Sequence, residues 1–225
     1  GFSGVGTWSV AAVAWAGSLA VMLLVLAVSA RVNDNTTVLI LGLLFTSGAG
    51  AIVNILQYFS SESMLKAFIV WTMGSLGSIT TGQLSVVLPA VMVGVLLAFL
   101  KMKDLNAFLL GETYARSLGV NIHLSRLIIF LGASLLTGTI TAFCGPIGFV
   151  GIAVPHLARV IFRSSDHLVL LPASILLGAD AMLLSDIIAQ LPGMQTTLPI
   201  NSVTALLGIP VVVWMIVRNR KFTEI

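Results

Sequence analysis

Almost wholly apolar segments, separated by short polar connections, make up most of this chain. Most of them are long enough to cross a hydrocarbon core of roughly 30 Å as a helix. There are seven: Trp8–Val28, Thr37–Phe59, Leu84–Leu100, Arg126–Phe143, Ile147–Phe162, Leu168–Gln190 and Asn201–Val217. The pattern predicts an all-α, polytopic membrane bundle of seven transmembrane helices that forms one domain over residues 1–225.

The composition supports a membrane protein. Hydrophobic residues make up 58% of the chain and charged residues 8%, with a mean hydropathy of +1.09. Charged residues make up about a quarter of a typical soluble domain, so that class is excluded. Cys144 is the single cysteine, which excludes an internal disulfide and a cysteine-based metal cluster. The chain starts with Gly1 and has no charged stretch before its first apolar segment. We therefore expect this chain to be part of a longer polypeptide rather than a protein with a signal peptide.

The positive charges fall in alternate connections. Of 11 Lys and Arg residues, only Lys66 lies in an even-numbered connection. The others are Arg31, Lys101, Lys103, Arg116, Arg126, Arg159, Arg163, Arg218, Arg220 and Lys221. Positive connections stay on the cytoplasmic side during insertion, so residues 101–125 are predicted inside and residues 60–83 outside an inner membrane. Because the cations follow topology, the pI near 9.4 does not indicate nucleic-acid binding.

The connection at residues 101–125 is too polar to span and too regular for a linker. We expect a first short helix with Asp104 or Asn106 as its cap and a second over Glu112–Leu118. Glu112 and Arg116 have the favourable i,i+4 order for an ion pair. The expected helix stops are Gly111 and Gly119. The residues alone leave two interpretations open: a docking surface for a partner, or an interfacial loop with none.

Two further patterns concern packing. Met64–Met73 is apolar but too short to span, so it predicts a short helix near the outer surface. Cys144–Gly151 reverses the chain within a few residues. Its glycines lack the preceding strand and the following Lys-Ser/Thr of a phosphate-binding loop, so close helix contact is the better interpretation. Small residues at Ser134, Gly138 and Ala142 continue this pattern.

No catalytic motif or paired histidine for a metal occurs, so we expect neither an enzyme nor a resident metal or cofactor. Asp180 and Asp186 are the notable ionisable residues, because an acid within a span normally faces a cavity or a partner. Their separation of six residues places them about 120° apart around a helix, so they cannot form one carboxylate site. Structural hydrogen bonding of Asp180 is the favoured interpretation and a proton-coupling carboxylate is the alternative.

Four sequence blocks carry a family resemblance. They are LNAFLLGETYARSLGV (105–120), GPIGFVGIAVPHLARVI (145–161), DHLVLLPASILLGA (166–179) and LPINSVTALLGIPVVVWMI (198–216). In order and spacing they resemble the FecCD-type permeases, which are membrane subunits of ABC importers for iron-siderophore complexes, haem and cobalamin. Members have about ten spans in a type II importer fold. The resemblance therefore covers the C-terminal two thirds, without the first three spans.

The resemblance implies partners and roles. Coupling helices at about 104–120 would contact a cytoplasmic ABC ATPase through Gly111, Glu112, Ala115, Arg116 and Gly119. The permease would form a homodimer in membrane lipid, and a periplasmic or lipid-anchored substrate-binding protein would dock outside. Members such as the cobalamin permease have Arg where this chain has Gln190, so that docking contact lacks its charge here. The LPIN sequence at Asn201 resembles a variant of iron-type permeases.

We therefore expect a non-enzymatic permease for a metal chelate, whose ATP hydrolysis resides in a separate subunit. The alternative is a proton- or ion-coupled secondary transporter that uses Asp180 and Asp186. Such transporters usually contain internal repeats, and none is evident here.

Overall fold

The computed structural model describes residues 4–29, 35–190 and 197–220, so the expected turn at 31–36 and the connection after Gln190 fall largely outside it. Within these residues the chain is entirely α-helical apart from turns and loops. The helices are α1 Gly4–Ser29, α2 Asn35–Tyr58, α3 Glu62–Met73, α4 Thr81–Leu100, α5 Met102–Phe108, α6 Glu112–Ser117, α7 Ile122–Cys144, α8 Val150–Phe162, α9 His167–Ala189 and α10 Ile200–Arg220. The expected all-α class is confirmed.

The expected membrane segments differ in length. Five helices, α1, α2, α4, α7 and α9, are long and apolar enough to cross a membrane. The other two expected segments correspond to the shorter apolar helix α8 and the apolar part of α10, Ile200–Trp214. With 13 residues, α8 is only about 20 Å long. A continuous span over 147–162 is therefore wrong in detail, because residues 145–149 form a loop before the helix begins.

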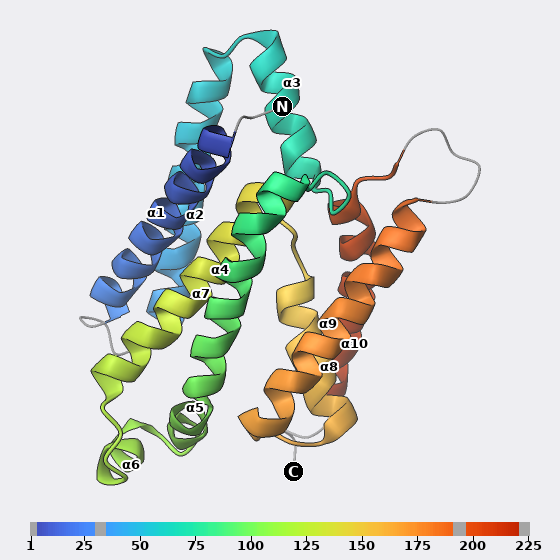
Figure 1. Ribbon diagram of the computed structural model, residues 1–225. Coiled ribbons are helices and arrows are strands. Elements are labelled where there is room, and N and C mark those ends of the chain that lie inside the picture. Colours follow the sequence, from blue (N-terminus) through green and yellow to red (C-terminus); the bar gives the residue numbers. More distant parts are fainter. Residues whose placement is uncertain (1–3, 30–34, 191–196, 221–225) are drawn as a thin grey trace.

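The helices of the seven expected membrane segments, α1, α2, α4, α7, α8, α9 and α10, alternate in direction along the chain (Figure 1). Figure 1 shows α5, α6, the α8–α9 connection and the last turn of α10 at one end of the bundle, with α3 and the start of α1 at the other. The cation-rich connections that the structure describes therefore share one end, as the charge pattern predicts. Lys66 belongs to α3 at the opposite end.

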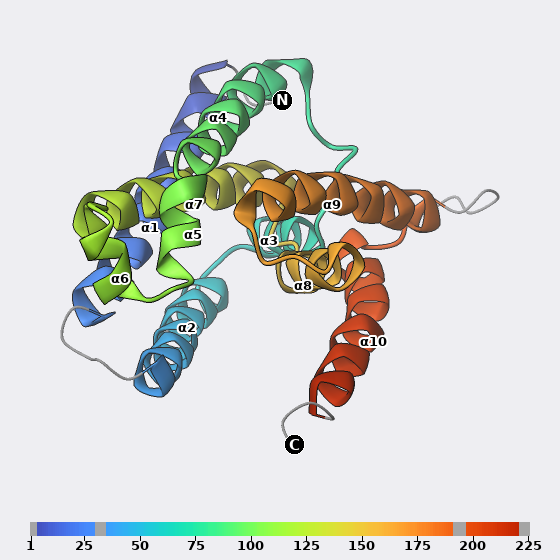
Figure 2. The ribbon, with the colours of Figure 1, turned by 90° about the horizontal axis from the view of Figure 1, so that it is seen from below.

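The long helices form two groups, which Figure 2 shows side by side from below. In the first, α1, α4 and α7 enclose a core of Ala11, Val86, Val87 and Phe143. In the second, α8 and α9 enclose Ala158, Leu170 and Ala173, and α10 packs against both helices. The structure thus has two separate small cores.

Small residues bring the helices of the first group together. A Cβ added to Gly138 would lie 2.8 Å from Ser18 Oγ, and Ser18 Oγ donates a hydrogen bond to the Ser134 carbonyl at 2.9 Å. On α4, a Cβ added to Gly94 would lie 2.5 Å from Leu136 Cγ. The small-residue pattern on α7 therefore marks close packing, as expected from the sequence.

At the end that the charge pattern predicts to lie outside, hereafter the outer end, α3 meets the α7–α8 loop through backbone atoms. Gly145 has φ +81°, and a Cβ there would lie 2.3 Å from the Trp71 carbonyl oxygen. The Ser75 amide donates to the Cys144 carbonyl at 2.9 Å. Close contact thus explains Gly145, whereas a Cβ at Gly151 would meet nothing within 4 Å. The packing interpretation of the loop glycines is correct for the first of them and wrong for the last.

Candidate functional site at the cation-rich end

Two short helices, α5 and α6, lie between α4 and α7 at the cation-rich end of the bundle (Figure 1). Gly111 has φ +96° and Gly119 has φ +81°. L-residues rarely adopt this conformation, so these glycines allow the chain to turn after each helix. The expected caps are wrong, because α5 begins at Met102 after Lys101. Asp104 lies in its first turn, and Asn106 lies inside the helix.

The α6 helix has one buried point and an exposed outer surface. Ala115 is fully buried, which allows the helix to lie close to the chain beneath it. In α6 and the turns next to it, four large apolar side chains are more than half exposed: Leu109, Leu110, Tyr114 and Leu118. An exposed apolar patch of this kind on a short projecting helix is typical of an interaction site.

Arg116 lies beside this patch, is exposed and forms no ion pair with any residue that the structure describes. Glu112 instead pairs with Arg126 at the start of α7. The expected pairing of Glu112 with Arg116 is therefore wrong. Both members of the observed pair are more than a third exposed, so it contributes only about 0.2–1 kcal/mol. Its main consequence is to orient α6 on α7, while the Arg116 guanidinium remains free to bind another molecule.

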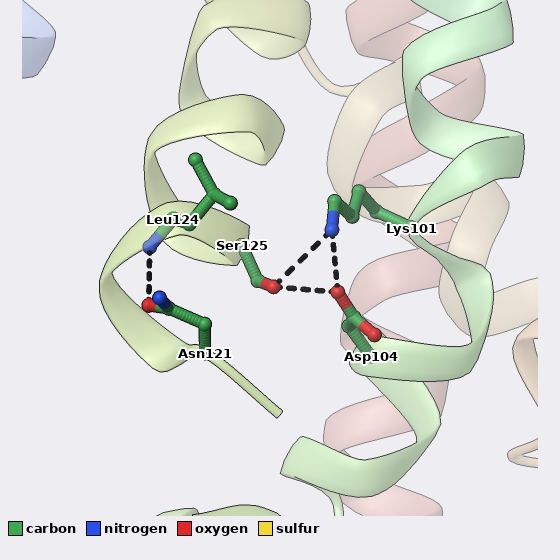
Figure 3. Close-up of polar contacts among 5 residues, drawn as sticks. All are labelled: Lys101, Asp104, Asn121, Leu124 and Ser125. Carbon is green, nitrogen blue, oxygen red and sulfur yellow. Dashed lines mark hydrogen bonds and ion pairs between the residues drawn. The ribbon is translucent and has the colours of Figure 1, made fainter. Parts of the chain in front are cut away.

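A polar cluster fixes α5 against α4 and α7 (Figure 3). Lys101 Nζ lies 2.8 Å from Asp104 Oδ2 and 3.4 Å from Ser125 Oγ. The Ser125 hydroxyl, which is almost fully buried, donates to the same carboxylate oxygen at 2.5 Å. Asn121 caps α7 next to it by accepting from the Leu124 amide at 3.1 Å.

The cluster keeps Asp104 ionised. Burial raises the pKa of this carboxyl, but the hydrogen bonds from Lys101 and Ser125 and the positive charge of Lys101 outweigh it, so the pKa is lower than its ordinary value. The sequence alone does not predict this cluster as a unit. The i,i+3 spacing of Lys101 and Asp104 was the available signal, but nothing in the sequence brings Ser125 to them.

The acids of α9 lie in different surroundings. Asp186 Oδ2 accepts a hydrogen bond from Gln190 Nε2 at 2.7 Å, and both residues line an outer pocket of about 490 Å³ between α3, α7, α9 and α10. Asp180 lies near the middle of α9 and is exposed. It forms no hydrogen bond or ion pair with the residues described, so the expected structural hydrogen bond to Ser, Thr or backbone is not found there. The two acids do not form one site.

The histidines do not form a metal site. No group of three His, Cys, Asp or Glu side chains arranged to hold a metal occurs in the described residues. His156 is exposed on α8. His167 begins α9 and contacts Asn106 of α5.

Known proteins match this chain over most of its length. A model of the FecCD transport family matches residues 1–218. The hemin transport system permease protein HmuU of Yersinia pestis is 35% identical over 209 residues, which cover 92% of this chain and 62% of that protein. The vitamin B12 import system permease protein BtuC of Klebsiella pneumoniae is 34% identical over 95% of this chain and 64% of its own length. The chain thus spans less than two thirds of these relatives.

A solved structure gives the same picture. It is described as a metal-chelate type ABC transporter in an inward-facing conformation. It superimposes with a TM-score of 0.74 at 30% sequence identity, over 89% of this chain and 64% of its own.

Proposed function

The chain belongs to the FecCD transport family, and from this premise we propose that it is the permease part of an ATP-binding-cassette importer. One observation carries the proposal beyond family membership. The α5–α6 unit projects at the cation-rich end, presents exposed apolar side chains and leaves the Arg116 guanidinium without an ion-pair partner among the residues that the structure describes. A cytoplasmic ATPase subunit is a partner that fits this surface.

In this proposal α5 and α6 are the coupling helices. Gly111 and Gly119 provide the turns, and Ala115 provides the close contact with the rest of the permease. Glu112 orients α6 through Arg126, and Arg116 contacts the ATPase. A rigid unit held in this way passes the closing movement of the ATPase to the spans on either side. The chain itself hydrolyses nothing.

The cargo class is a metal chelate, namely an iron-siderophore complex, haem or cobalamin. Support comes from relatives named for hemin and vitamin B12 import and from the metal-chelate type structure. The permease works as a homodimer in the bacterial inner membrane. The helix α2 supports this, because none of its membrane window is buried within the chain and its apolar surface is available to a second copy or to lipid. A substrate-binding protein docks at the outer end near Gln190.

The second candidate is a proton-coupled transporter, favoured by the exposed mid-helix carboxylate of Asp180. Acids inside spans often serve as proton relays. Against it, Asp186 is held by Gln190 and does not share a site with Asp180.

Reconstitution separates the two candidates. The full-length permease, its ATPase and its binding protein are placed in proteoliposomes, and uptake of labelled chelate is measured with the proton gradient collapsed. An importer of this family takes up chelate only with ATP, and the ATPase co-purifies with it. Uptake driven by a pH gradient without ATP would overturn the proposal in favour of the second candidate.

A further inference from the structure

The two helix groups meet mainly at their ends. At the outer end α3 packs against α10, and at the cation-rich end α5 packs against α9. Figure 2, seen from the cation-rich end, shows α5 in front of α7 and next to the beginning of α9. Among the described helices, α5, which follows α4 of the first group, thus makes the main contact with the second group at the end where the ATPase is proposed to bind.

Asn106 forms this contact with its whole side-chain amide. Its Nδ2 donates to Asp166 Oδ1 at 2.6 Å. Its Oδ1 accepts from the His167 backbone amide at 2.8 Å and lies 2.7 Å from His167 Nδ1. A carbonyl oxygen only accepts, so the His167 ring must carry its proton on Nδ1 in this arrangement. Three hydrogen bonds therefore join one side chain of α5 to the first residues of α9.

The acceptor of this contact also fixes the start of α9. Asp166 is the N-cap residue, and its Oδ1 accepts from the Leu168 amide at 2.9 Å as well as from Asn106. The Leu168 amide, followed by the Asn106 amide, lowers the pKa of the Asp166 carboxyl below its ordinary value, so it is ionised at neutral pH. Hydrogen bonds to an ionised acceptor are shorter and stronger than neutral ones. The same carboxylate oxygen thus accepts the hydrogen bond from α5 and caps the N-terminus of α9.

The opposite side of α5 is attached to the first group. Asp104 lies two residues before Asn106, which places the two side chains about 200° apart around the helix. Asp104 binds Lys101 at the end of α4 and Ser125 of α7. Polar contacts therefore hold the short helix on both sides. Asp104 attaches it to the first group and Asn106 attaches it to the second.

We propose that Asn106 is a positioning residue that transfers the movement of the coupling helices to the α8–α10 group through Asp166 and His167. This inference rests on the proposed importer function. Without the link, an ATPase-driven movement of α5 and α6 acts on α4 and α7 only. ATP is then hydrolysed, but the second group does not follow and little chelate is imported. The predicted consequence is uncoupling rather than unfolding.

An exchange of the two side chains tests the link in the full-length permease reconstituted with its ATPase and binding protein. Asn106→Asp alone places two carboxylates against each other. We expect chelate imported per ATP hydrolysed to fall about tenfold, since a hydrogen bond to a charged group is replaced by repulsion. Asn106→Asp/Asp166→Asn restores one donor and one acceptor, and Asn caps a helix about as well as Asp. The pair should return to within about twofold of wild type, because contacting residues are coupled.

Ser164→Ala is the matched control. It removes the hydrogen bond from the Asp166 amide to Ser164 Oγ in the same turn and touches nothing on α5. Its import per ATP should equal that of wild type. Wild-type coupling in Asn106→Asp overturns the inference. So does a double variant that assembles and hydrolyses ATP but remains uncoupled.

A covalent bridge keeps the inference testable if Asn106→Asp does not assemble. The thiols of an Asn106→Cys/Asp166→Cys pair are joined by a short bifunctional reagent, which the native Cys144 escapes because it is buried. A permanent link should preserve ATP-driven import, because α5 and the start of α9 move together in this proposal. Import abolished by the bridge would show that they separate during transport, and the inference would be wrong. If the unmodified complex shows no ATP-driven import at all, the proposed function itself fails.

Discussion

The two helix groups meet at the outer end and at the cation-rich end, hereafter the outer and the inner junction. The two junctions differ in the kinds of atoms that form them. At the outer end the contact is mainly between backbones, because Gly74 and Gly145 allow α3 to touch the α7–α8 loop. One side chain adds to it: Asn201 Oδ1 accepts from the Gly148 amide at 3.1 Å. At the cation-rich end, side chains such as Asn106 and Asp104 form the junction through hydrogen bonds. Steric contacts between backbones tolerate almost no change in geometry. Side-chain hydrogen bonds next to water can lengthen or exchange partners at a modest net cost.

The difference indicates that the two junctions have different roles. The outer junction fixes how the groups meet, whereas the inner junction lies where an external force is proposed to act. Changes at the outer junction should therefore abolish folding, and changes at the inner junction should leave a folded protein with altered transport.

The largest effect is expected for Gly145→Ala. The new Cβ would lie 2.3 Å from the Trp71 carbonyl oxygen, at a φ of +81° that L-residues rarely adopt. We expect a loss of more than about 3 kcal/mol of folding free energy and little monodisperse protein after detergent extraction. Size-exclusion chromatography and a thermal melt measure this. Gly151→Ala is the control, because a Cβ there meets nothing within 4 Å. Equal yields of the two variants would contradict the idea of a rigid outer junction.

Arg116→Glu should have the next largest effect, on transport alone. The side chain is exposed and unpaired within the described part of the chain, so the thermal midpoint should not change. Reversal of its charge at a protein interface should reduce ATPase association or ATP-driven uptake about tenfold or more. Lys66→Glu, which reverses an exposed cation on α3 at the opposite end, is the control and should retain ATPase binding. Wild-type uptake and wild-type ATP hydrolysis in Arg116→Glu would remove Arg116 from the coupling surface.

The cluster around Asp104 predicts a smaller, pH-dependent effect on stability. Its folded-state pKa lies below the unfolded value of 3.8. Its contribution is therefore complete above that value and is lost as the pH falls through the lower, folded-state pKa. Asp104→Asn should lower the stability at neutral pH by about 1 kcal/mol, since the pair is partly exposed. Thermal midpoints of wild type and variant should converge in acid. A difference that stays constant with pH would mean that ionisation of Asp104 does not stabilise the inner junction.

The sequence predicts the parts of this structure that depend on long runs of one property. Apolar length predicts the long helices, and alternation of cations predicts the end at which α5 and α6 lie. The pairing of individual side chains is different, because it depends on which helices become neighbours. Glu112 has a suitably spaced partner in Arg116, yet Arg126 of the next helix takes its place.

Helix caps show the same limit. Asn106 has the chemistry of a cap, but α5 begins four residues earlier and its amide is free to reach α9. Both errors arise where tertiary neighbours outcompete local ones. The tight contact of Gly145 is a partial exception. A turn of only a few residues between two apolar segments is visible in the sequence, although its neighbour Trp71 is not.

The smallest effect is expected at Asp180, which belongs to neither junction. It lies near the middle of α9, is exposed and has no hydrogen-bond partner among the described residues. If ATP hydrolysis drives import through α5, no proton needs to cross the membrane on a carboxylate. Asp180→Asn, which is nearly isosteric, should then keep uptake within about twofold of wild type, whereas a proton relay would lose its titratable group. Uptake by both proteins is measured in vesicles with ATP and a collapsed proton gradient. Two results together would contradict this: abolished uptake in Asp180→Asn, and full wild-type uptake driven by a pH gradient alone. They would show that proton transfer at Asp180 in α9, and not ATP hydrolysis acting through the inner junction, drives transport.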